Sequence, residues 1–451
     1  MADREQCDYT SGRLARNIWD LGLPMTAGQL LFALPGIMES YWLGKLGSVA
    51  LAAASMGTAL RIVVISLIMG LSTGGMALVS RHVGAGEQAA ADQATQQTQV
   101  LILIAAALLG AGGFVLAPPL LRLMGAEGAM LREGVRYARV VFVGLWAMEL
   151  IPSMAALLRG AGSAECAFRI SLVASVSACF LQPFLILGWG SLPSLGVRGA
   201  ALAQVLGNTA GLVLQQYIFL TGRARIHIRL AELGFDRHMM GRILRLALPA
   251  AVERFMPNLA RTIMLALIAA WGTATLAGYN VTTRVFSLTM MASMGLGAVA
   301  PTLVGQNLGA QQPERAERSA WAVAGVAMSL VVPLLIPLTL LAPQAIALFN
   351  TEPAVIAAGT HCLRVMATGQ AFMSLGMIIA MSLRGAGDTL SPMLISTGTL
   401  WLVQIPLAYG LPQVAGWGTT GLWLALTITP IVSAGAMSLR FRQGRWKMRR
   451  I

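Results

Sequence analysis

Gly222-Arg223-Ala224-Arg225-Ile226-His227-Ile228-Arg229 opens the longest polar interruption in an otherwise apolar chain of 451 residues. The interruption continues to Arg245, lies close to the midpoint of the chain, and carries six arginines against the acids Glu232 and Asp236. We interpret the segment 222–245 as a basic linker between an N-terminal lobe, 1–221, and a C-terminal lobe, 246–451.

The two halves repeat each other at an offset of 225 positions. Leu21-Gly22-Leu23-Pro24 recurs as Leu246-Ala247-Leu248-Pro249, and Leu158-Arg159-Gly160-Ala161-Gly162 recurs as Leu383-Arg384-Gly385-Ala386-Gly387. Later landmarks drift slightly, since Gln182-Pro183 faces the looser Gln404-Ile405-Pro406. Self-similarity that keeps its register over so long a stretch indicates an internal duplication.

Composition excludes a soluble globule. The chain is 56% hydrophobic and only 11% charged, whereas about a quarter of the residues in a soluble domain carry charge. Windows of about 20 apolar residues, the length that crosses a bilayer as a helix, predict twelve spans, six on each side of the linker. These spans cover 18–43, 49–80, 98–120, 135–158, 169–189, 197–221, 246–271, 276–304, 320–346, 358–383, 392–411 and 416–439.

The spans predict an all-α membrane protein of twelve transmembrane helices in two six-helix lobes. They contain Gly and Pro freely and show no alternation with a period of two, so helices are favoured over a barrel. Because each lobe has an even number of spans, both copies enter the membrane from the same side, which is the parallel repeat of secondary transporters.

The balance of Lys and Arg in the short loops predicts the orientation. The basic N-terminus, the linker and the tail from Arg440 to Arg450 fall on one side, so both termini and the linker are expected in the cytoplasm. We attribute the net charge of +14 to this topology and to attraction by anionic membrane lipids, and not to nucleic acid. No motif suggests ATP hydrolysis, so an ion gradient is expected to drive transport.

Four segments resemble one family of transporters. Met38-Glu39-Ser40-Tyr41-Trp42-Leu43-Gly44-Lys45-Leu46-Gly47 is similar to the end of the first helix of multidrug and toxic compound extrusion (MATE) transporters, where an acid follows the helix-opening proline by fifteen positions, as Glu39 follows Pro24. Gly305–Ala310, Leu383–Pro392 and Gly196–Ala203 resemble the family's turn after helix eight, loop after helix ten and entry to helix six. The resemblance covers nearly the whole chain, in order.

The resemblance implies a twelve-helix antiporter of the bacterial inner membrane. Such a protein exports organic, often cationic compounds in exchange for protons or sodium by alternating access, and it is neither an enzyme nor dependent on a cofactor or metal. We place the chain nearer the DNA-damage-inducible-protein-F-like branch than the sodium-linked one, and we expect a monomer. The rival interpretations are a flippase for lipid-linked precursors, an intramembrane enzyme acting on lipid, and a non-transporting scaffold.

Glu39 is the first candidate for ion coupling. A carboxylate at membrane depth costs several kcal/mol unless it is neutralised, paired or hydrated. Fifteen residues beyond Pro24 place Glu39 about 22 Å into its helix, towards the outer half of the membrane. A carboxyl group there can take a proton from outside and release it inside; the alternative is an interfacial Glu whose side chain reaches the helix end.

Gln182 stands where the resemblance implies a second acid, just before the proline of the fifth helix. It can hydrogen-bond to Glu39 but cannot titrate, so the two-carboxylate form of proton coupling is not expected here. A sodium-linked branch carries a further acid eleven residues before the Arg-Gly pair at 384, and here that position is the uncharged Met373.

The second half supplies the remaining candidates. Glu253, one turn after Pro249, either attracts a cation or is neutralised by Arg254 or by Arg284. Asp388 is expected to cap the amides of the helix that follows it and to meet Arg384, and Arg159 and Arg384 are expected to be structural groups at matching helix ends. Glu149, Arg61, Arg261 and Arg284 lie inside spans and need partners, which the sequence alone does not identify.

Overall fold

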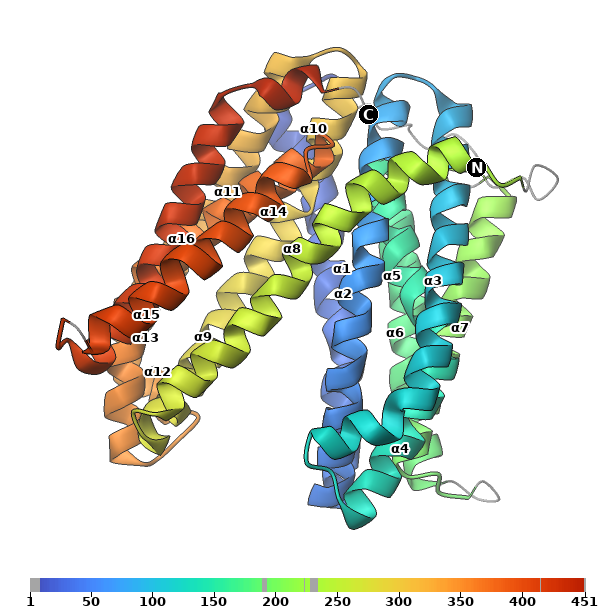
Figure 1. Ribbon diagram of the computed structural model, residues 1–451. Coiled ribbons are helices and arrows are strands. Elements are labelled where there is room, and N and C mark those ends of the chain that lie inside the picture. Colours follow the sequence, from blue (N-terminus) through green and yellow to red (C-terminus); the bar gives the residue numbers. More distant parts are fainter. Residues whose placement is uncertain (1–8, 189–192, 223, 228–233, 414, 450–451) are drawn as a thin grey trace. The chain divides into compact units, whose positions relative to one another are not determined.

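A computed structural model describes residues 9–188, 193–222, 224–227, 234–413 and 415–449, and these residues are overwhelmingly helical (Figure 1). The helices of the first half are α1 (Leu14–Leu46), α2 (Ser48–Gly84), α3 (Gln88–Leu123), α4 (Gly128–Val143), α5 (Leu145–Gly160), α6 (Ala164–Leu187) and α7 (Val197–Leu220). The second half contains α8 (Arg237–Ala269), α9 (Thr273–Gly297), α10 (Val299–Gly309), α11 (Pro313–Leu340), α12 (Ala342–Ala347), α13 (Pro353–Gly385), α14 (Leu390–Gly398), the π-helical η2 (Thr399–Gln404), α15 (Ile405–Gln413), α16 (Gly418–Arg442) and the 3-10 turn η3 (Arg445–Met448).

Ten helical segments of the described chain are long and apolar enough to cross a membrane, and α4 with α5, bent by 53° between them, makes eleven. The seventh predicted span, 246–271, corresponds to α8. This helix falls outside the set because Glu253, Arg254 and Arg261 all lie within its apolar stretch. The chain is thus an all-helical membrane protein, as predicted.

Contacts divide the chain into two units, and both divisions fall just after a repeated proline. The first unit contains Ala27–Ala251, and the second contains Tyr9–Thr26 with Val252–Ile451. Thr26 follows Pro24 by two residues, and Ala251 follows Pro249 by two residues. The first turns of α1 therefore belong to the second unit, and the first turns of α8 belong to the first unit.

The first turns of α1 and of α8 each pack closely against a glycine of the unit to which they belong. Within the first unit, a side chain at Gly70 of α2 would meet the backbone oxygen of Ala247 at 2.6 Å. Within the second unit, a side chain at Gly295 of α9 would lie 2.8 Å from the Cα of Thr26. Gly70 and Gly295 are separated by the repeat offset of 225, so the same close approach occurs once in each unit.

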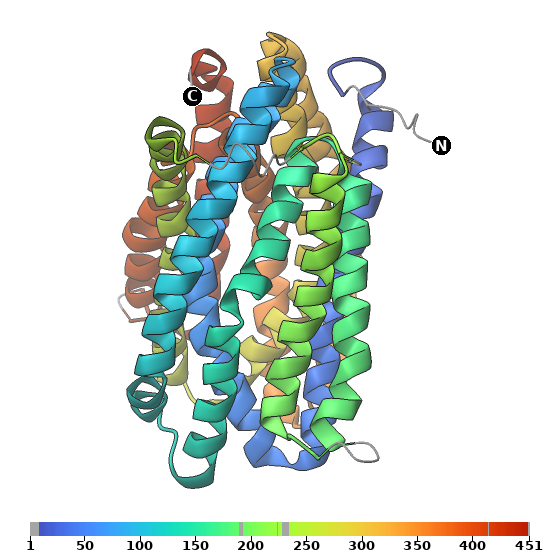
Figure 2. The same ribbon diagram turned by 90° about the vertical axis from the view of Figure 1, so that its right-hand side faces the viewer.

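The duplication seen in the sequence extends to the helix bounds. At the offset of 225, α2 corresponds to α9 with α10, from Thr273 to Gly309, and α4 with α5 corresponds to α13, from Pro353 to Gly385. The helices of one unit lie side by side, as Figure 2 shows for α6 and α7. Helix α2, and α4 with α5, therefore have counterparts of the same length in the other half.

The repeated Leu-Arg-Gly-Ala-Gly motif ends its helix in the same way in both halves. Gly162 and Gly387 have φ angles of 88° and 85°, which a glycine adopts without steric cost. The amide of Gly162 donates to the carbonyl oxygen of Arg159, and that of Gly387 to Arg384, each at 2.9 Å. This is the glycine-terminated helix end that satisfies the last carbonyl groups, so the motif is conformational in both copies.

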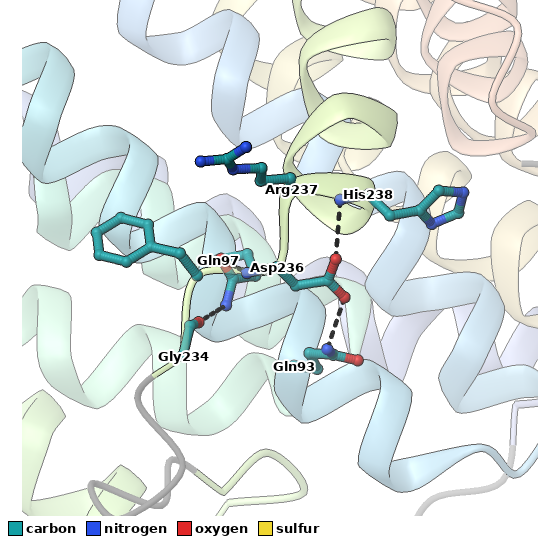
Figure 3. A pocket seen from close by; sticks show the side chains of 7 residues that line it. Gln93, Gln97, Gly234, Asp236, Arg237 and His238 are labelled. Atoms are coloured by element: carbon teal, nitrogen blue, oxygen red, sulfur yellow. Dashed lines mark hydrogen bonds between the residues drawn. The ribbon is translucent and has the colours of Figure 1, made fainter.

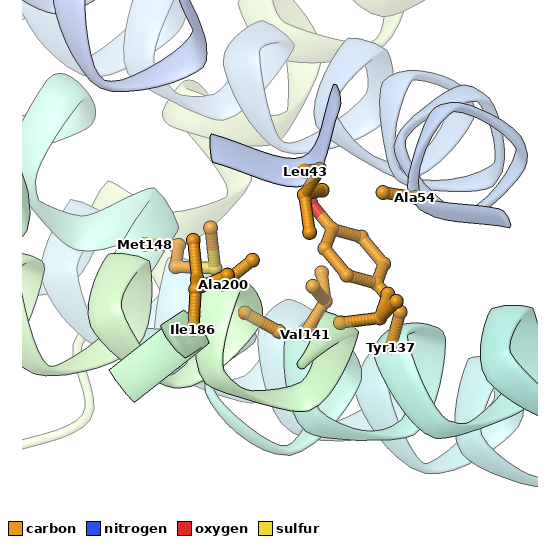
Figure 4. Close-up of a cluster of buried hydrophobic side chains, with 9 residues drawn as sticks. Leu43, Ala54, Tyr137, Val141, Met148, Ile186 and Ala200 are labelled. Atoms are coloured by element: carbon orange, nitrogen blue, oxygen red, sulfur yellow. The ribbon is translucent and has the colours of Figure 1, made fainter. Parts of the chain in front are cut away.

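The cores of the two units also correspond. One buried cluster of the first unit includes Leu43, Ala54, Tyr137, Ala200 and Ala201 (Figure 4). A buried cluster of the second unit includes their counterparts, Ile268, Tyr279, Cys362, Leu422 and Trp423. The offset is 225 for the first three pairs and 222 for the last two, which matches the drift of register seen in the sequence.

The described parts of the linker are held against α3. Asp92 accepts a hydrogen bond from the amide of His227 at 2.9 Å, and Gln97 donates to the carbonyl oxygen of Gly234 at 2.6 Å. Asp236 accepts from the amide of His238 at 2.8 Å, which caps the start of α8. Gln97, Gly234, Asp236 and His238 line a polar pocket, seen from close by in Figure 3, whose volume is about 510 Å³. Residues 237–245 of the predicted linker belong to α8 itself.

Candidate functional site

Glu39 lies in the last two turns of α1 and is buried, with 6% of its surface exposed. Its Oε2 accepts a hydrogen bond from the amide nitrogen of Gln204 on α7. Its Oε1 is buried without a hydrogen-bond partner. The carboxyl group therefore lies inside the first unit and not at a solvated helix end.

Tyr137 of α4 is the second neighbour of Glu39 and is 1% exposed. Its hydroxyl also lies 3.2 Å from the hydroxyl of Thr58 on α2. Figure 4 shows the ring within the apolar cluster, with its oxygen directed towards α1 near Leu43. Two uncharged polar side chains, Gln204 and Tyr137, therefore hold Glu39.

Arg61 of α2 and Glu149 of α5 form an ion pair within the same unit. Their Nε and Oε1 atoms are 3.7 Å apart, and the side chains are 14% and 1% exposed. Arg61 also interacts electrostatically with Glu39. Two of the four residues that the sequence left without partners inside spans are thus partners of each other.

Gln182 of α6 is completely buried but does not bond to the Glu39 carboxylate. Its amide nitrogen donates to the backbone oxygen of Pro35, one turn earlier on α1, at 2.8 Å. The expected partner of Glu39 is thus replaced by Gln204. Gln182 instead supports the backbone of α1 at a carbonyl oxygen beneath Glu39.

Glu253 pairs with a residue that the sequence assigned to a structural loop. Its Oε2 accepts from Nη1 of Arg384 at 2.9 Å, and its Oε1 lies 3.4 Å from the hydroxyl of Ser396. Arg254, the first partner that the sequence offered, interacts electrostatically with Glu253. Arg284, the second, is exposed on α9, and Arg384 makes the direct contact instead. The sequence suggested a partner on the next helix along the chain. Arg384 instead lies at the end of α13, which is far from Glu253 in the sequence.

Asp388 is 1% exposed and has the capping role predicted for it. Its Oδ1 accepts from the amide of Ser391, and its Oδ2 from the Ser391 hydroxyl at 2.7 Å. Its cations come from the C-terminal segment and not from Arg384: Arg449 lies at 2.6 Å and Arg440 at 3.7 Å. Part of the basic tail is therefore bound within the second unit.

Arg159 lies in the last turn of α5, at the position that matches Arg384 in α13. Its carbonyl oxygen takes part in the helix end described above. Arg384 has the same backbone role and also neutralises Glu253. The two arginines are equivalent in sequence and in backbone role, whereas the position that matches Glu253 in the first repeat is Gly28.

The sequence pointed to some members of the site and missed others. Neither Gln204 nor Tyr137 belongs to a sequence motif. The one available signal was the polar amide of Gln204 inside the predicted span 197–221, because such a group needs a hydrogen-bond partner in the membrane. Among the described residues, no group of three His, Cys, Asp or Glu side chains is placed to bind a metal ion.

The sequence model of the family named MatE matches the chain twice, at residues 24–184 and 249–410. Both matches begin at the repeated prolines, Pro24 and Pro249. The chain belongs to the multidrug and toxic compound extrusion (MATE) family. MATE proteins are membrane transporters and not enzymes, and the double match agrees with the internal repeat.

Curated relatives align with this MATE protein over nearly its full length. An FAD transporter of Shewanella oneidensis is 26% identical over 94% of this chain and 93% of its own. The probable multidrug resistance protein YoeA of Bacillus subtilis is 25% identical over 95% and 93%. The multidrug resistance protein PmpM of Pseudomonas aeruginosa is 25% identical over 92% and 88%.

Solved structures share the fold. A MATE transporter in a bent conformation superimposes with a TM-score of 0.89 at 23% identity, over 96% of both chains. An outward-facing MATE transporter superimposes with a TM-score of 0.87 at 22% identity, over 98% of this chain and 100% of the other.

Proposed function

We propose that this MATE protein is a secondary antiporter that exports organic, often cationic or amphiphilic, compounds in exchange for protons. Glu39 is the group that binds and releases the proton. The observation that carries the proposal is the buried position of Glu39 between two uncharged partners, Gln204 and Tyr137. A carboxyl group that lacks a hydrogen-bonded cation can alternate between charged and neutral forms.

The coupling cycle follows from the cost of charge in this environment. Protonation from outside neutralises Glu39, which weakens the binding of a cationic substrate and allows α1 to repack. Release of the proton to the cytoplasm restores the charge and the affinity for the next substrate. Gln182 keeps the backbone of α1 anchored at Pro35 while the carboxyl group changes its charge.

Protons are favoured over sodium by the residues of the second unit. Met373, at the position of the acid found in the sodium-linked branch, is apolar and 43% exposed. Glu253 is already neutralised by Arg384. These observations support the DNA-damage-inducible-protein-F-like branch. We further propose a monomer in the bacterial inner membrane with both termini in the cytoplasm.

The substrate is proposed from the relatives. Two of those described above are named as multidrug resistance proteins, which favours organic drug-like compounds. A second substrate class is a flavin dinucleotide, because the relative from Shewanella oneidensis is an FAD transporter. FAD therefore belongs beside cationic dyes among the compounds to be tested.

Transport by the purified protein in lipid vesicles tests the proposal. Dye or FAD movement is measured with an imposed pH gradient or an imposed sodium gradient, for the parent, Glu39→Gln and Glu253→Gln. We expect transport to follow the pH gradient and Glu39→Gln to abolish it, while protein folding is unchanged. Transport driven by sodium alone, or full pH-driven transport by Glu39→Gln, contradicts the proposal. Movement of lipid-linked precursors with no dye transport would favour the flippase.

A further inference from the structure

Glu39 belongs to a group of two acids, Glu39 and Glu149, and one cation, Arg61. Arg61 of α2 pairs with Glu149 of α5 and also acts on Glu39 of α1. Tyr137 of α4 is the other titratable group at Glu39, and the amide of Gln204 comes from α7. With both acids ionised the group carries one net negative charge, and with one proton added it is neutral.

The fold does not need these charges. At the offset of 225, the second repeat has Met264 in place of Glu39, Phe286 in place of Arg61 and Ser374 in place of Glu149. Met264 and Phe286 are buried core residues of that unit, and Ser374 is buried with a hydrogen bond from Ser293 at 2.9 Å. The same helices therefore pack without an ion pair, which points to a role other than packing for Arg61 and Glu149.

The ion pair is loose. At 3.7 Å the Nε–Oε1 contact is too long for a hydrogen bond. Arg61 Nε and Glu149 Oε1 are both buried without a hydrogen-bond partner, as is Glu39 Oε1. Buried charged atoms that lack hydrogen bonds are costly, so a small movement of the guanidinium between the two acids changes little in packing and much in electrostatic energy.

We propose that Glu149 is a positioning residue that keeps Arg61 away from Glu39. While Glu149 holds the guanidinium, Glu39 exchanges its single proton; without Glu149, Arg61 turns to Glu39 and holds it ionised. With Glu149 present, the group of Glu39, Arg61 and Glu149 binds one proton per cycle. Arg61, which both acids share, sets the pH at which that proton binds. This inference rests on the proposed role of Glu39 as the proton-binding group.

Paired charge variants in lipid vesicles test the inference. The rate of pH-driven dye transport is measured against pH for the parent, Glu149→Gln and the double variant Arg61→Met with Glu149→Gln. Glu165→Gln is the matched control, because Glu165 pairs with Arg169 at an exposed site on α6. Dye exchange without a gradient, together with thermal stability, reports whether each variant is folded and binds substrate.

We expect Glu149→Gln to displace the pH profile to lower pH by about one unit or more, since an unshared cation now faces Glu39. The double variant should return the profile towards that of the parent, because the freed cation is also removed. Gradient-free exchange should persist in both variants, and Glu165→Gln should match the parent.

An unchanged pH profile in Glu149→Gln overturns the inference, as does a double variant with the same displaced profile as the single one. Glu39→Gln in the same vesicles separates this failure from that of the proposed function. If Glu39→Gln retains pH-driven transport, the coupling proposal itself is wrong. If Glu39→Gln is inactive while Glu149→Gln equals the parent, only the role of Glu149 is wrong.

Discussion

Equivalent helices of the two units enclose the carboxyl group of Glu39 in the first unit and apolar side chains in the second. Tyr137 belongs to the first cluster and neighbours Glu39, whereas their counterparts Cys362 and Met264 both belong to the second cluster. Surrounding positions match closely, since Leu43 corresponds to Ile268 and Ala200 to Leu422. One backbone arrangement thus accommodates both kinds of side chain, so packing by itself does not require the buried acid.

In the second unit the buried acid is Glu253, and it lies at a position that does not correspond to Glu39. Glu253 is bound by Arg384 at 2.9 Å, and the positions that match this pair in the first repeat are Gly28 and Arg159. The Glu253 carboxylate thus contacts a cation directly, whereas the Glu39 carboxylate accepts a hydrogen bond from the uncharged amide of Gln204. This contrast supports the proposal that proton exchange belongs to the first unit.

Introducing an acid into the second cluster should give the largest effect on stability. Met264→Glu places a carboxyl group at the position that matches Glu39, without a counterpart of Gln204 or Arg61 beside it. We expect a loss of about 5 kcal/mol in the free energy of unfolding, because the buried charge is uncompensated. Thermal unfolding in detergent measures the loss.

Met264→Leu is the control for this change and should cost less than about 1.5 kcal/mol, since volume and polarity are nearly kept. A Met264→Glu protein as stable as the parent would show that the second cluster tolerates an acid. The contrast between the two units would then have no energetic basis.

Breaking the pair of the second unit should have the next largest effect. Glu253→Ala leaves Arg384 buried without its carboxylate and should cost about 3 kcal/mol. The double variant Glu253→Ala with Arg384→Ala should lose less free energy of unfolding than the two single variants lose together. The difference should be about 1 kcal/mol or more, because the two charges are in contact. Thermal unfolding of the four proteins gives the coupling energy, and additive losses would contradict a direct pair.

The smallest effect concerns a turn that differs between the repeats by one residue. Gly86 has a φ angle of 76° and its counterpart Gln311 has 58°, and the same pattern of amide bonds closes both helix ends. A side chain in this left-handed region costs roughly 1–2 kcal/mol. We expect Gln311→Gly to raise the free energy of unfolding by about 0.5–1 kcal/mol, after the entropy of glycine is included.

Gly86→Ala should lower the free energy of unfolding by about 1 kcal/mol for the same reason. The control is Gln312→Gly, one residue away at φ −116°, which should give no gain. A stabilisation by Gln312→Gly equal to that by Gln311→Gly would show that the φ angle of residue 311 is not the cause.

The sequence by itself determined the features that depend on local pattern. Long apolar windows predicted the helices, and the offset of 225 predicted the duplication that helix ends at Gly162 and Gly387 repeat. The acid fifteen residues after Pro24 predicted a buried Glu39. These features follow from hydrophobicity, from helical rise and from the backbone freedom of glycine, all of which can be read from consecutive residues.

Only the tertiary structure decided which side chains meet. Gln204 and not Gln182 bonds to Glu39, Arg384 and not Arg284 pairs with Glu253, and Arg61 pairs with Glu149. Each pair joins helices far apart in the chain, so it depends on how each helix is rotated about its axis and how far it is displaced along it. Packing of many residues sets that rotation, and no single motif records it.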